Sequence, residues 1–226
     1  MHILVTAGPT REFIDPVRFL SNPSTGRMGF AVARAAQATG HRVTLVAGPV
    51  SLPTPKGVRR IDVVSARDMM AAVDGEEFDC IVAAAAVADW RPAECAAGKL
   101  KKREMSGTLK LVRNPDVLKT VSAKIRSAGK KAVLIGFAAE TGEPTAEAAR
   151  KCAEKGLDLV VANDVTAAKC GFGVSTNRVA FVHPDGTVDH LPLLSKSAVA
   201  RRIVTFAEKA FADGRRDHEP CDIMSP

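Results

Sequence analysis

The chain has 226 residues, of which 46% are hydrophobic, and its 32 Lys and Arg against 25 Asp and Glu give a net charge of +7. This composition suits one globular α/β domain with a single core, which we expect over residues 1–213, followed by a disordered polar tail at 214–226. The longest apolar run, residues 80–88, is too short to cross a bilayer, and no signal segment opens the chain. We therefore expect a cytoplasmic protein with no membrane contact.

The cysteines and the positive charge exclude few classes of function. Five cysteines without a C-x-x-C pair predict neither a disulfide framework nor a zinc site. The charge alone would suit nucleic acid, but the cations do not follow one helix or alternate with aromatic residues, and the chain has no tyrosine. A polyanionic small ligand explains the charge equally well, and we expect no nucleic-acid partner.

The first predicted strand, residues 2–7, is joined to the first predicted helix by an unusually long connection, residues 8–29. Such connections usually take about 2–6 residues, so one of about 16 with no regular structure of its own predicts a functional loop. Its hydroxyl, amide and guanidinium groups, with the free N–H groups of a helix start near Ser24, suit an anionic ligand. The alternative is a packed loop capped by Ser24.

The next predicted strands are residues 42–47 and 58–64. The first of these ends in Ala-Gly-Pro, whereas a dinucleotide-binding domain usually has an acidic residue there, and the long connection contains no G-x-G-x-x-G. An NAD-dependent oxidoreductase is therefore a poor explanation. Ser65 opens a helix, with Asp68 at the capping-box distance.

The continuous apolar run at 78–86 predicts a strand buried on both faces of a parallel sheet. Alanines at its carboxyl end leave room for a ligand, although packing beneath a helix explains them equally well. The basic segment 91–107 that follows is either a mobile flap that closes over phosphates or a solvated loop.

A further strand is expected at 108–113, and Asn114 is the expected N-cap of the next helix, with Pro115 at its first position. The following strand, 132–138, brings Phe137 to its end. There the ring can pack on a nucleotide base or in the core.

The predicted helix 145–155 carries Lys151 and Lys155 on one face. Like charges at this spacing indicate an anionic partner, but they are also common on solvated faces. Residues 157–162 form the last parallel strand, and a hairpin and a helix over 195–213 complete the domain.

Several of these segments resemble, in order, phosphopantothenoylcysteine synthetase, the coenzyme A pathway ligase that bacteria often carry fused behind a flavin-dependent decarboxylase. The resemblance covers about residues 2–210, with Pro9 where the family pattern has glycine and Arg27 where it has lysine. The motifs are TAGPTREFIDPVRFLSNPSTGRMG (6–29), AAAVADWRP (84–92), KLKK (99–102), NPD (114–116), GFAAET (136–141), AND (162–164), FGVSTNRV (172–179) and LPLLSKSAVA (191–200).

The resemblance implies a three-layer Rossmann-like α/β fold with a mostly parallel central sheet and a C-terminal β-hairpin plus helix. It also implies an acid–amine ligase that joins 4′-phosphopantothenate to L-cysteine with CTP, through an acyl-cytidylate, and releases pyrophosphate and CMP. Mg²⁺ would bridge the phosphates. The partners would be a second copy of the chain and a flavin-dependent decarboxylase domain or subunit.

The resemblance also implies site residues. Lys99 would promote the activation step, Asn22 would hold the acyl group and its oxyanion, and Arg18 would meet the substrate of the neighbouring subunit. Substrate contacts are implied for Arg18, Asn22, Ala85, Ala86 and Asp89. Nucleotide contacts are implied for Ala83, Ala84, Ala85, Asp89, Lys99, Pro115, Asp116, Val117, Leu118, Phe137, Lys151 and Lys155. No protein ligand to a metal is identified.

Three questions stay open at the level of sequence. Pro9 and Arg27 leave room for a catalytically degenerate nucleotide-binding module of the same fold. The residues do not distinguish CTP from ATP. A nonspecific nucleic-acid binder would instead show a steep dependence on salt concentration.

Overall fold

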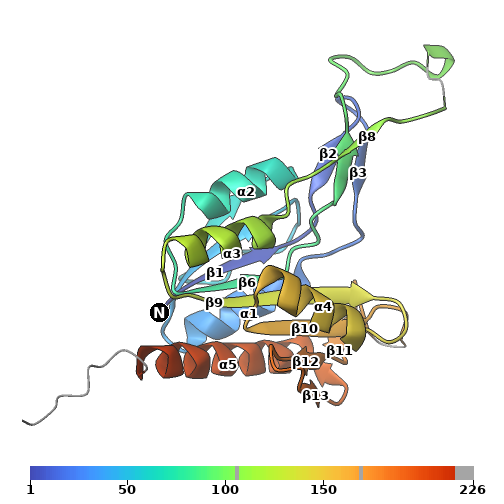
Figure 1. The fold of residues 1–226 in the computed structure, drawn as a ribbon. Coiled ribbons are helices and arrows are strands. Elements are labelled where there is room, and N and C mark those ends of the chain that lie inside the picture. Colours follow the sequence, from blue (N-terminus) through green and yellow to red (C-terminus); the bar gives the residue numbers. More distant parts are fainter. Residues whose placement is uncertain (105–106, 168–169, 217–226) are drawn as a thin grey trace, which may run out of the picture.

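A computed structural model describes residues 1–104, 107–167 and 170–216. Its centre is an eight-stranded sheet in the order β13-β12-β10-β9-β6-β1-β4-β5 (Figure 1). The parallel strands are β1 (His2–Ala7), β4 (Arg42–Ala47), β5 (Arg59–Asp62), β6 (Cys80–Ala83), β9 (Val133–Glu140) and β10 (Leu159–Asp164). The hairpin of β12 (Ala180–Val182) and β13 (Val188–His190) adds the antiparallel edge.

Helices cover both faces of this sheet, which gives the three layers expected from the sequence (Figure 1). The helices are α1 (Arg27–Ala38), α2 (Ala66–Asp74), α3 (Val117–Ser127), α4 (Thr145–Lys155) and α5 (Lys196–Arg216). Helices α1 and α5 share one core with alternate residues of the strands, and α2, α3 and α4 share the other. In β1, for example, Val5 faces the α1–α5 side and Leu4 the other, because successive strand residues point to opposite faces.

Two short hairpins project from the sheet as an arm, which we define as residues 11–21, 90–104 and 107–113 (Figure 1). One hairpin pairs β2 (Arg11–Phe13) with β3 (Phe19–Ser21), and the other pairs β7 (Trp90–Pro92) with β8 (Leu111–Arg113). The expectation that residues 8–29 lack regular structure was therefore wrong. The smallest elements are β11 (Thr176–Asn177), β14 (Leu194–Ser195) and the 3-10 turn η1 (Lys102–Glu104).

Helix starts are confirmed or corrected by local hydrogen bonds. The Ser65–Asp68 capping box of α2 is present. Helix α3, however, is capped by Asp116, whose carboxylate accepts from the N–H of Lys119 at 3.0 Å, and not by Asn114. Asn114 is otherwise engaged, because its side-chain amide donates to the carbonyl of Ala88 at 2.8 Å.

Helix α1 begins without the expected side-chain cap. Its N-cap is Gly26, in the left-handed conformation at φ 74°, and the Ser24 hydroxyl only accepts from the Gly26 N–H at 3.4 Å. Gly29 lets the helix press against β1, since a Cβ there would lie 2.5 Å from that of Ala7. The first turn of α1 therefore keeps N–H groups available beside the end of β1.

Some element ends also differ from the expectations. Strand β6 stops at Ala83 because the chain then turns toward the loop after β1, where Ala86 N–H donates to the carbonyl of Gly8 at 2.8 Å. Strand β9 continues to Glu140 in register with β10, so Phe137 lies inside the strand and not at its end. Helix α5 runs to Arg216, and residues 217–226 of the expected tail lie outside the described residues.

Across the described ranges, no helix combines the length and hydropathy that a membrane span needs.

Candidate functional site

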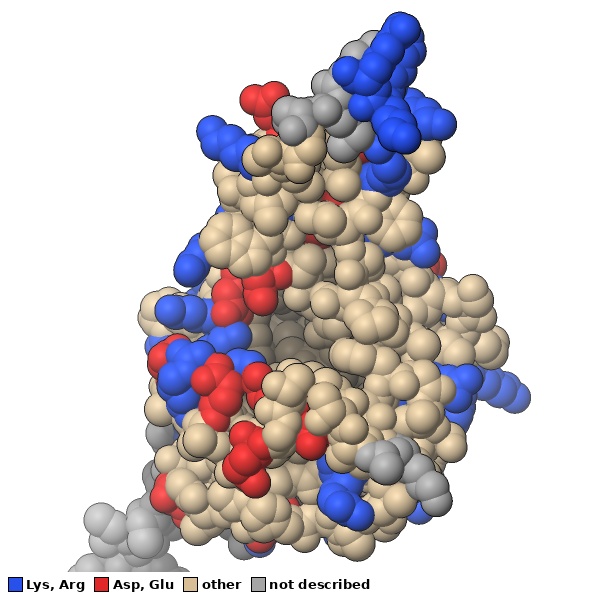
Figure 2. Space-filling view, turned by 90° about the vertical axis from the view of Figure 1, so that its right-hand side faces the viewer, with Lys and Arg blue, Asp and Glu red and all other residues tan. Residues whose placement is uncertain are grey.

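The sheet grows in opposite directions from the pair β1 and β6. Strands β4 and β5 follow β1 on one side, whereas β9 and β10 follow β6 on the other. Such a switch point leaves a crevice at the carboxyl ends of the two central strands, which is where open α/β sheets bind ligands. Figure 2 shows this end of the molecule hollowed below the arm, with acidic and basic side chains along one rim of the hollow.

The floor of the crevice is the backbone of residues 84–89, which is held by one side chain of β1 and one of the loop that follows it. The N–H of Ala85 donates to the Thr6 hydroxyl at 3.2 Å, and the N–H of Ala88 donates to the Thr10 hydroxyl at 3.0 Å. Both threonines are buried. A chain of small residues is thus fixed with its backbone open to a ligand.

Asn22, the residue that follows β3, contacts this floor. Its side-chain amide donates to the carbonyl of Ala86 at 3.0 Å, which orients the amide at the crevice. Asp89 closes the stretch, and its carbonyl accepts from the N–H of Asn114 at 2.8 Å. The two motifs around residues 84–92 and 114–116 are therefore joined by main-chain and side-chain bonds.

A wide cavity of about 810 Å³ brings together most residues that the sequence singled out. It lies between the carboxyl ends of the central strands, the start of α3 and one side of α4. The predicted residues that line it are Asn22, Ala83, Ala85, Ala86, Asp89, Pro115, Asp116, Val117, Leu118, Phe137, Lys151 and Lys155. Ala84 lines a second, narrow cavity, whereas Lys99 and Arg18 line neither of the two.

The predicted lysines of α4 are paired with carboxylates in the wall of the wide cavity. Lys155 Nζ lies 2.7 Å from Asp116 Oδ2, and Lys151 Nζ lies 2.6 Å from Glu140 Oε1. Burial of Asp116 opposes its ionisation, but the hydrogen bonds from Lys155 and from the Lys119 N–H, with the positive charges of both lysines, together outweigh burial and lower the pKa of Asp116. An anionic ligand would therefore have to displace these carboxylates in order to bind the two ammonium groups.

The narrow cavity, about 120 Å³, lies at the start of α1 and adjoins the wide one through Ala85, Ala86 and Phe137. Lys196 lines it and is only 8% exposed. Its ammonium donates to the carbonyl of Gly171 at 2.9 Å, and no carboxylate among the described residues pairs with it. Burial, and then the neighbouring Arg27, lower the pKa of Lys196.

A second side chain in this cavity is also incompletely bonded. Asn177 is 4% exposed, and its Oδ1 has no hydrogen-bond partner in the described part of the chain. Residues 24–28, at the start of α1, line the same cavity, and no side chain caps that helix. A buried cation, a helix N-terminus and an unpaired amide together favour an anion that also offers a hydrogen-bond donor or bound water.

Sequence reasoning missed Lys196 and Asn177, although both lie in motifs that carried the resemblance. One signal was available: Lys196 opens α5, and a cation at the first position of a helix opposes the helix dipole. A lysine at this position therefore indicates an interaction outside its own helix.

Lys99 and Arg18 lie together on the arm. Arg18 Nη2 bonds to the Asp15 carboxylate at 2.5 Å and to the carbonyl of Leu100 at 2.9 Å. Lys99, next to Leu100, is exposed and has no hydrogen-bond or ion-pair partner within the described ranges. The structure therefore brings these two predicted residues near each other, but not into the cavities of their own chain.

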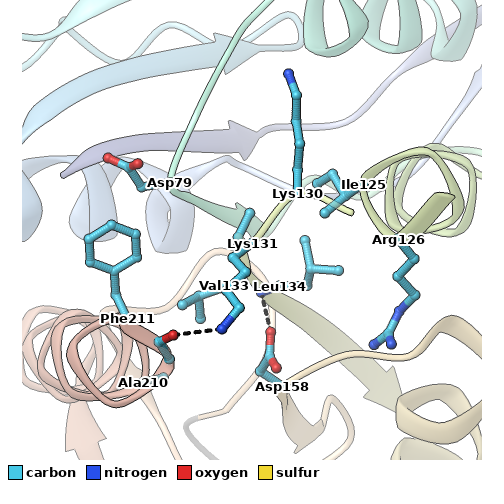
Figure 3. Close-up of a pocket in the computed structure, with 12 residues that line it drawn as sticks. Asp79, Ile125, Arg126, Lys130, Lys131, Val133, Leu134, Asp158, Ala210 and Phe211 are labelled. Carbon is cyan, nitrogen blue, oxygen red and sulfur yellow. Dashed lines mark hydrogen bonds between the residues drawn. The ribbon is translucent and has the colours of Figure 1, made fainter. Parts of the chain in front are cut away.

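Another cavity, about 420 Å³, lies at the amino ends of β9 and β10, away from the crevice (Figure 3). Its polar groups serve the fold. Asp158 accepts from the N–H of Leu134 at 2.7 Å, and Lys131 donates to the carbonyl of Gly214 at 2.8 Å (Figure 3). Because no set of polar groups converges there on free space, we assign no site to it.

Comparison with known proteins agrees with the geometry. Residues 1–210 match the family model of the DNA/pantothenate metabolism flavoprotein C-terminal domain. The coenzyme A biosynthesis bifunctional protein CoaBC of Vibrio vulnificus is 48% identical over 206 residues, 89% of this chain and 50% of that protein. The Bacillus subtilis CoaBC is 47% identical over 90% of this chain and 50% of its own length. This chain thus spans about half the length of these relatives.

A solved structure supports the same relationship. The crystal structure of the C-terminal domain of a CoaBC protein superposes with a TM-score of 0.77 at 40% identity, over 94% of this chain and 96% of that one. The resemblance inferred from the ordered motifs is confirmed, and the chain belongs to the family of DNA/pantothenate metabolism flavoprotein C-terminal domains.

Proposed function

We propose that this chain is a phosphopantothenate–cysteine ligase, which joins 4′-phosphopantothenate to L-cysteine with CTP and releases pyrophosphate and CMP. The observation that carries the proposal is the pair of adjoining cavities at the switch point of the sheet, one wide enough for a nucleoside and the other built for an anion. The relatives named CoaBC support the same assignment.

The chemistry requires a carboxylate to become an acyl donor. Attack of the carboxylate on the α-phosphate of CTP gives an acyl-cytidylate and pyrophosphate, and the cysteine amine then displaces CMP. These steps call for positioning and for stabilisation of negative charge more than for a protein nucleophile. In the proposed site, Lys99 stabilises charge on the leaving pyrophosphate, and Asn22 holds the acyl oxygen as it becomes an oxyanion.

The cavity walls suggest how the substrates are held. We assign the nucleoside to the wide cavity, where the turn at Pro115–Asp116 and the ring of Phe137 meet the base. Lys151 and Lys155 would leave their carboxylate partners for phosphate oxygens. The narrow cavity, with Lys196 and the start of α1, takes a further phosphate or carboxylate group.

Mg²⁺ is proposed only as a counter-ion of the nucleotide phosphates. Among the described residues, no group of three or more His, Cys, Asp or Glu side chains could hold a metal ion. Because Mg²⁺ usually takes only one or two protein carboxylates beside phosphate oxygens, we assign it no protein ligand and derive no step through the metal.

We also propose a homodimer formed through the arm. Large apolar side chains are exposed there, namely Val17, Phe19, Trp90, Leu109 and Leu111. Lys99 and Arg18 lie on the same arm, so a second copy could bring them to a site they do not reach in their own chain. Arg18 would then meet the phosphate or carboxylate of the partner's substrate.

Three further proposals follow from the relatives. The ligase unit spans residues 1–213, in keeping with the family match over 1–210. The bifunctional relatives are twice as long as the matched region, which suggests a flavin-dependent decarboxylase as a domain or a partner. We propose that the reaction takes place in the cytoplasm.

The first test is pyrophosphate release from the purified chain with Mg²⁺, CTP and 4′-phosphopantothenate, before and after L-cysteine is added, with ATP in parallel. A stoichiometric burst that becomes steady turnover with cysteine is expected. No release with either nucleotide, while CTP still binds, would favour the degenerate nucleotide-binding module instead.

Two variants separate the half-reactions. Lys99→Gln should suppress the burst even without cysteine, by at least about tenfold, because a charge beside the leaving group is lost. Asn22→Asp puts negative charge beside the developing oxyanion and should slow the cysteine step most. Lys124→Gln, which removes an exposed lysine of α3 that lines neither cavity, is a matched control. An unchanged burst in Lys99→Gln would remove the role proposed for that lysine.

A further inference from the structure

Asp15 is a completely buried carboxylate that the proposed chemistry does not use. It lies in the turn between β2 and β3, where its Oδ1 accepts from the N–H groups of Val17 at 2.9 Å and Arg18 at 2.8 Å. Its Oδ2 accepts from Arg18 Nε at 3.0 Å and from the N–H of Leu100 at 3.2 Å. One carboxylate thus joins this turn to the backbone of a distant loop.

Two further hydrogen bonds join the same loop and turn. Arg18 Nη2 donates to the carbonyl of Leu100 at 2.9 Å, and the N–H of Ala96 donates to the carbonyl of Ile14 at 2.9 Å. Both main-chain groups of Leu100 are therefore held by the Asp15–Arg18 pair. We call Asp15, Arg18 and Leu100 the arm clamp.

The arm clamp acts on the peptide next to Lys99. Lys99 lies in the long loop between β7 and β8, with an exposed side chain. Because the peptide unit is planar, fixing the N–H and the carbonyl of Leu100 also restricts the main chain of Lys99. The hydrogen bonds from Arg18 hold the pKa of Asp15 well below its usual range although burial opposes this, so the carboxylate stays ionised near neutral pH.

We propose that Asp15 is a positioning residue for the activation step, because it holds the guanidinium of Arg18 and the main chain beside Lys99 as one unit. The proposal rests on the proposed function. A loop of this length would otherwise sample many conformations. The activation step slows when the Lys99 ammonium is displaced from the leaving pyrophosphate.

The first experiment is limited trypsin digestion, which reports on the loop without any need for activity. In Asp15→Asn, cleavage after Lys99, Lys101 and Lys102 should be about tenfold faster than in the unaltered chain, because cleavage follows local opening of the loop. Mass spectrometry would place the cuts. Unchanged cleavage would overturn the clamp, as would equally faster cleavage throughout the chain.

A matched control removes a different turn aspartate. Asp185 accepts from the N–H of Thr187 at 2.9 Å and from its hydroxyl at 2.7 Å, in the β12–β13 turn. Asp185→Asn should leave cleavage of the arm loop unchanged. If Asp15→Asn does not fold, Arg18→Lys serves in its place, since it keeps the charge but cannot bridge Asp15 and Leu100 in the same way, and loop cleavage should still rise.

A double-mutant cycle tests whether Asp15 acts through Lys99. Asp15→Asn alone should slow the pyrophosphate burst, whereas in a Lys99→Gln background it should slow the burst no further. Additive losses, or a full burst in Asp15→Asn despite faster loop cleavage, would overturn the positioning role.

The ligase activity and the arm clamp are tested by separate measurements. An unaltered chain that releases no pyrophosphate would contradict the proposed function and, with it, the positioning role of Asp15. The trypsin comparison would still decide whether the arm clamp orders the loop.

Discussion

Lys196 occupies a position where a cation is unfavourable until an anion arrives. It is buried, it opens a helix, and Arg27 is its neighbour across the narrow cavity. Each of these features destabilises the ammonium in the free protein. Such a residue is retained where binding matters more than stability.

We therefore expect Lys196→Met to weaken CTP binding by at least about tenfold, because a charge-assisted contact is lost. Its free energy of unfolding at pH 7 should equal or exceed that of the unaltered chain, since an apolar side chain of similar length removes a burial penalty. Calorimetric titration and urea unfolding measure the two effects. Lys209→Met, on the exposed face of α5, is the control and should change neither.

The pH dependence provides a second check on Lys196. Its pKa is lower in the folded chain than in the unfolded one, so the folded state releases this proton first as pH rises. The stability advantage of Lys196→Met should therefore shrink as pH climbs toward the ordinary lysine pKa. An advantage that grows with pH, or tight CTP binding by the variant, would contradict this account.

At the scale of elements, the arm is fastened to the body by a buried carboxylate as well as by main chain. Glu12 on β2 is 3% exposed, and its Oε1 accepts from the N–H of Ala66 at the first turn of α2, at 2.9 Å. The N–H of Arg11 donates to the carbonyl of Val64 at 2.8 Å. The attachment of the arm thus depends on the start of a helix that belongs to the core.

We expect Glu12→Ala to lower the free energy of unfolding by about 1–3 kcal/mol, because the Ala66 N–H is left without a partner in a buried place. Glu12→Gln keeps an acceptor oxygen and should cost less. Urea unfolding is the measurement. The control is Glu77→Ala, which breaks an exposed pair with Lys130 and should stay within about 0.5 kcal/mol. Equal losses in both alanine variants would show that Glu12 is not an anchor.

At the scale of the whole molecule, basic side chains gather at the tip of the arm, whereas acidic and basic groups mix beside the hollow (Figure 2). The exposed cations of the arm loop are Lys99, Lys101, Lys102, Arg103 and Lys110. The arm also exposes apolar side chains, so this arrangement suits a dimer interface that places the cations of one arm at the site of the second copy. It suits nucleic acid less well, because the cations do not form a uniform basic stripe. The absence of a nucleic-acid partner stays a prediction.

We expect the chain to be a dimer at micromolar concentration and Trp90→Glu to make it a monomer. Trp90 is 45% exposed on β7, with Arg113 stacked on its ring. Burial of a carboxylate at this position in a dimer interface would be unfavourable. Light scattering after size exclusion measures the mass. The control is Leu193→Glu, which is exposed away from the arm and should remain dimeric. A monomeric unaltered chain would contradict the dimer.

Local sequence determined the elements whose causes are local. The apolar run of β1, the Ser65–Asp68 capping box of α2 and the bounds of α4 were predictable, because each depends on a continuous apolar run or on residues within a few turns of one another. The ordered motifs identified the family. They also singled out residues, among them Asp89, Asp116 and Phe137, that the fold gathers around one cavity.

Only the tertiary structure decided which groups are bonded to one another across the chain. Asp15 meets Leu100 over 85 positions, and Lys196 meets Gly171 over 25. Asn114 appeared to be a cap, but its amide is used by Ala88, 26 positions away. No periodicity encodes such contacts, because they arise when loops from separate strands converge at the carboxyl edge of the sheet, and the buried polar groups there must find partners after the sheet has formed.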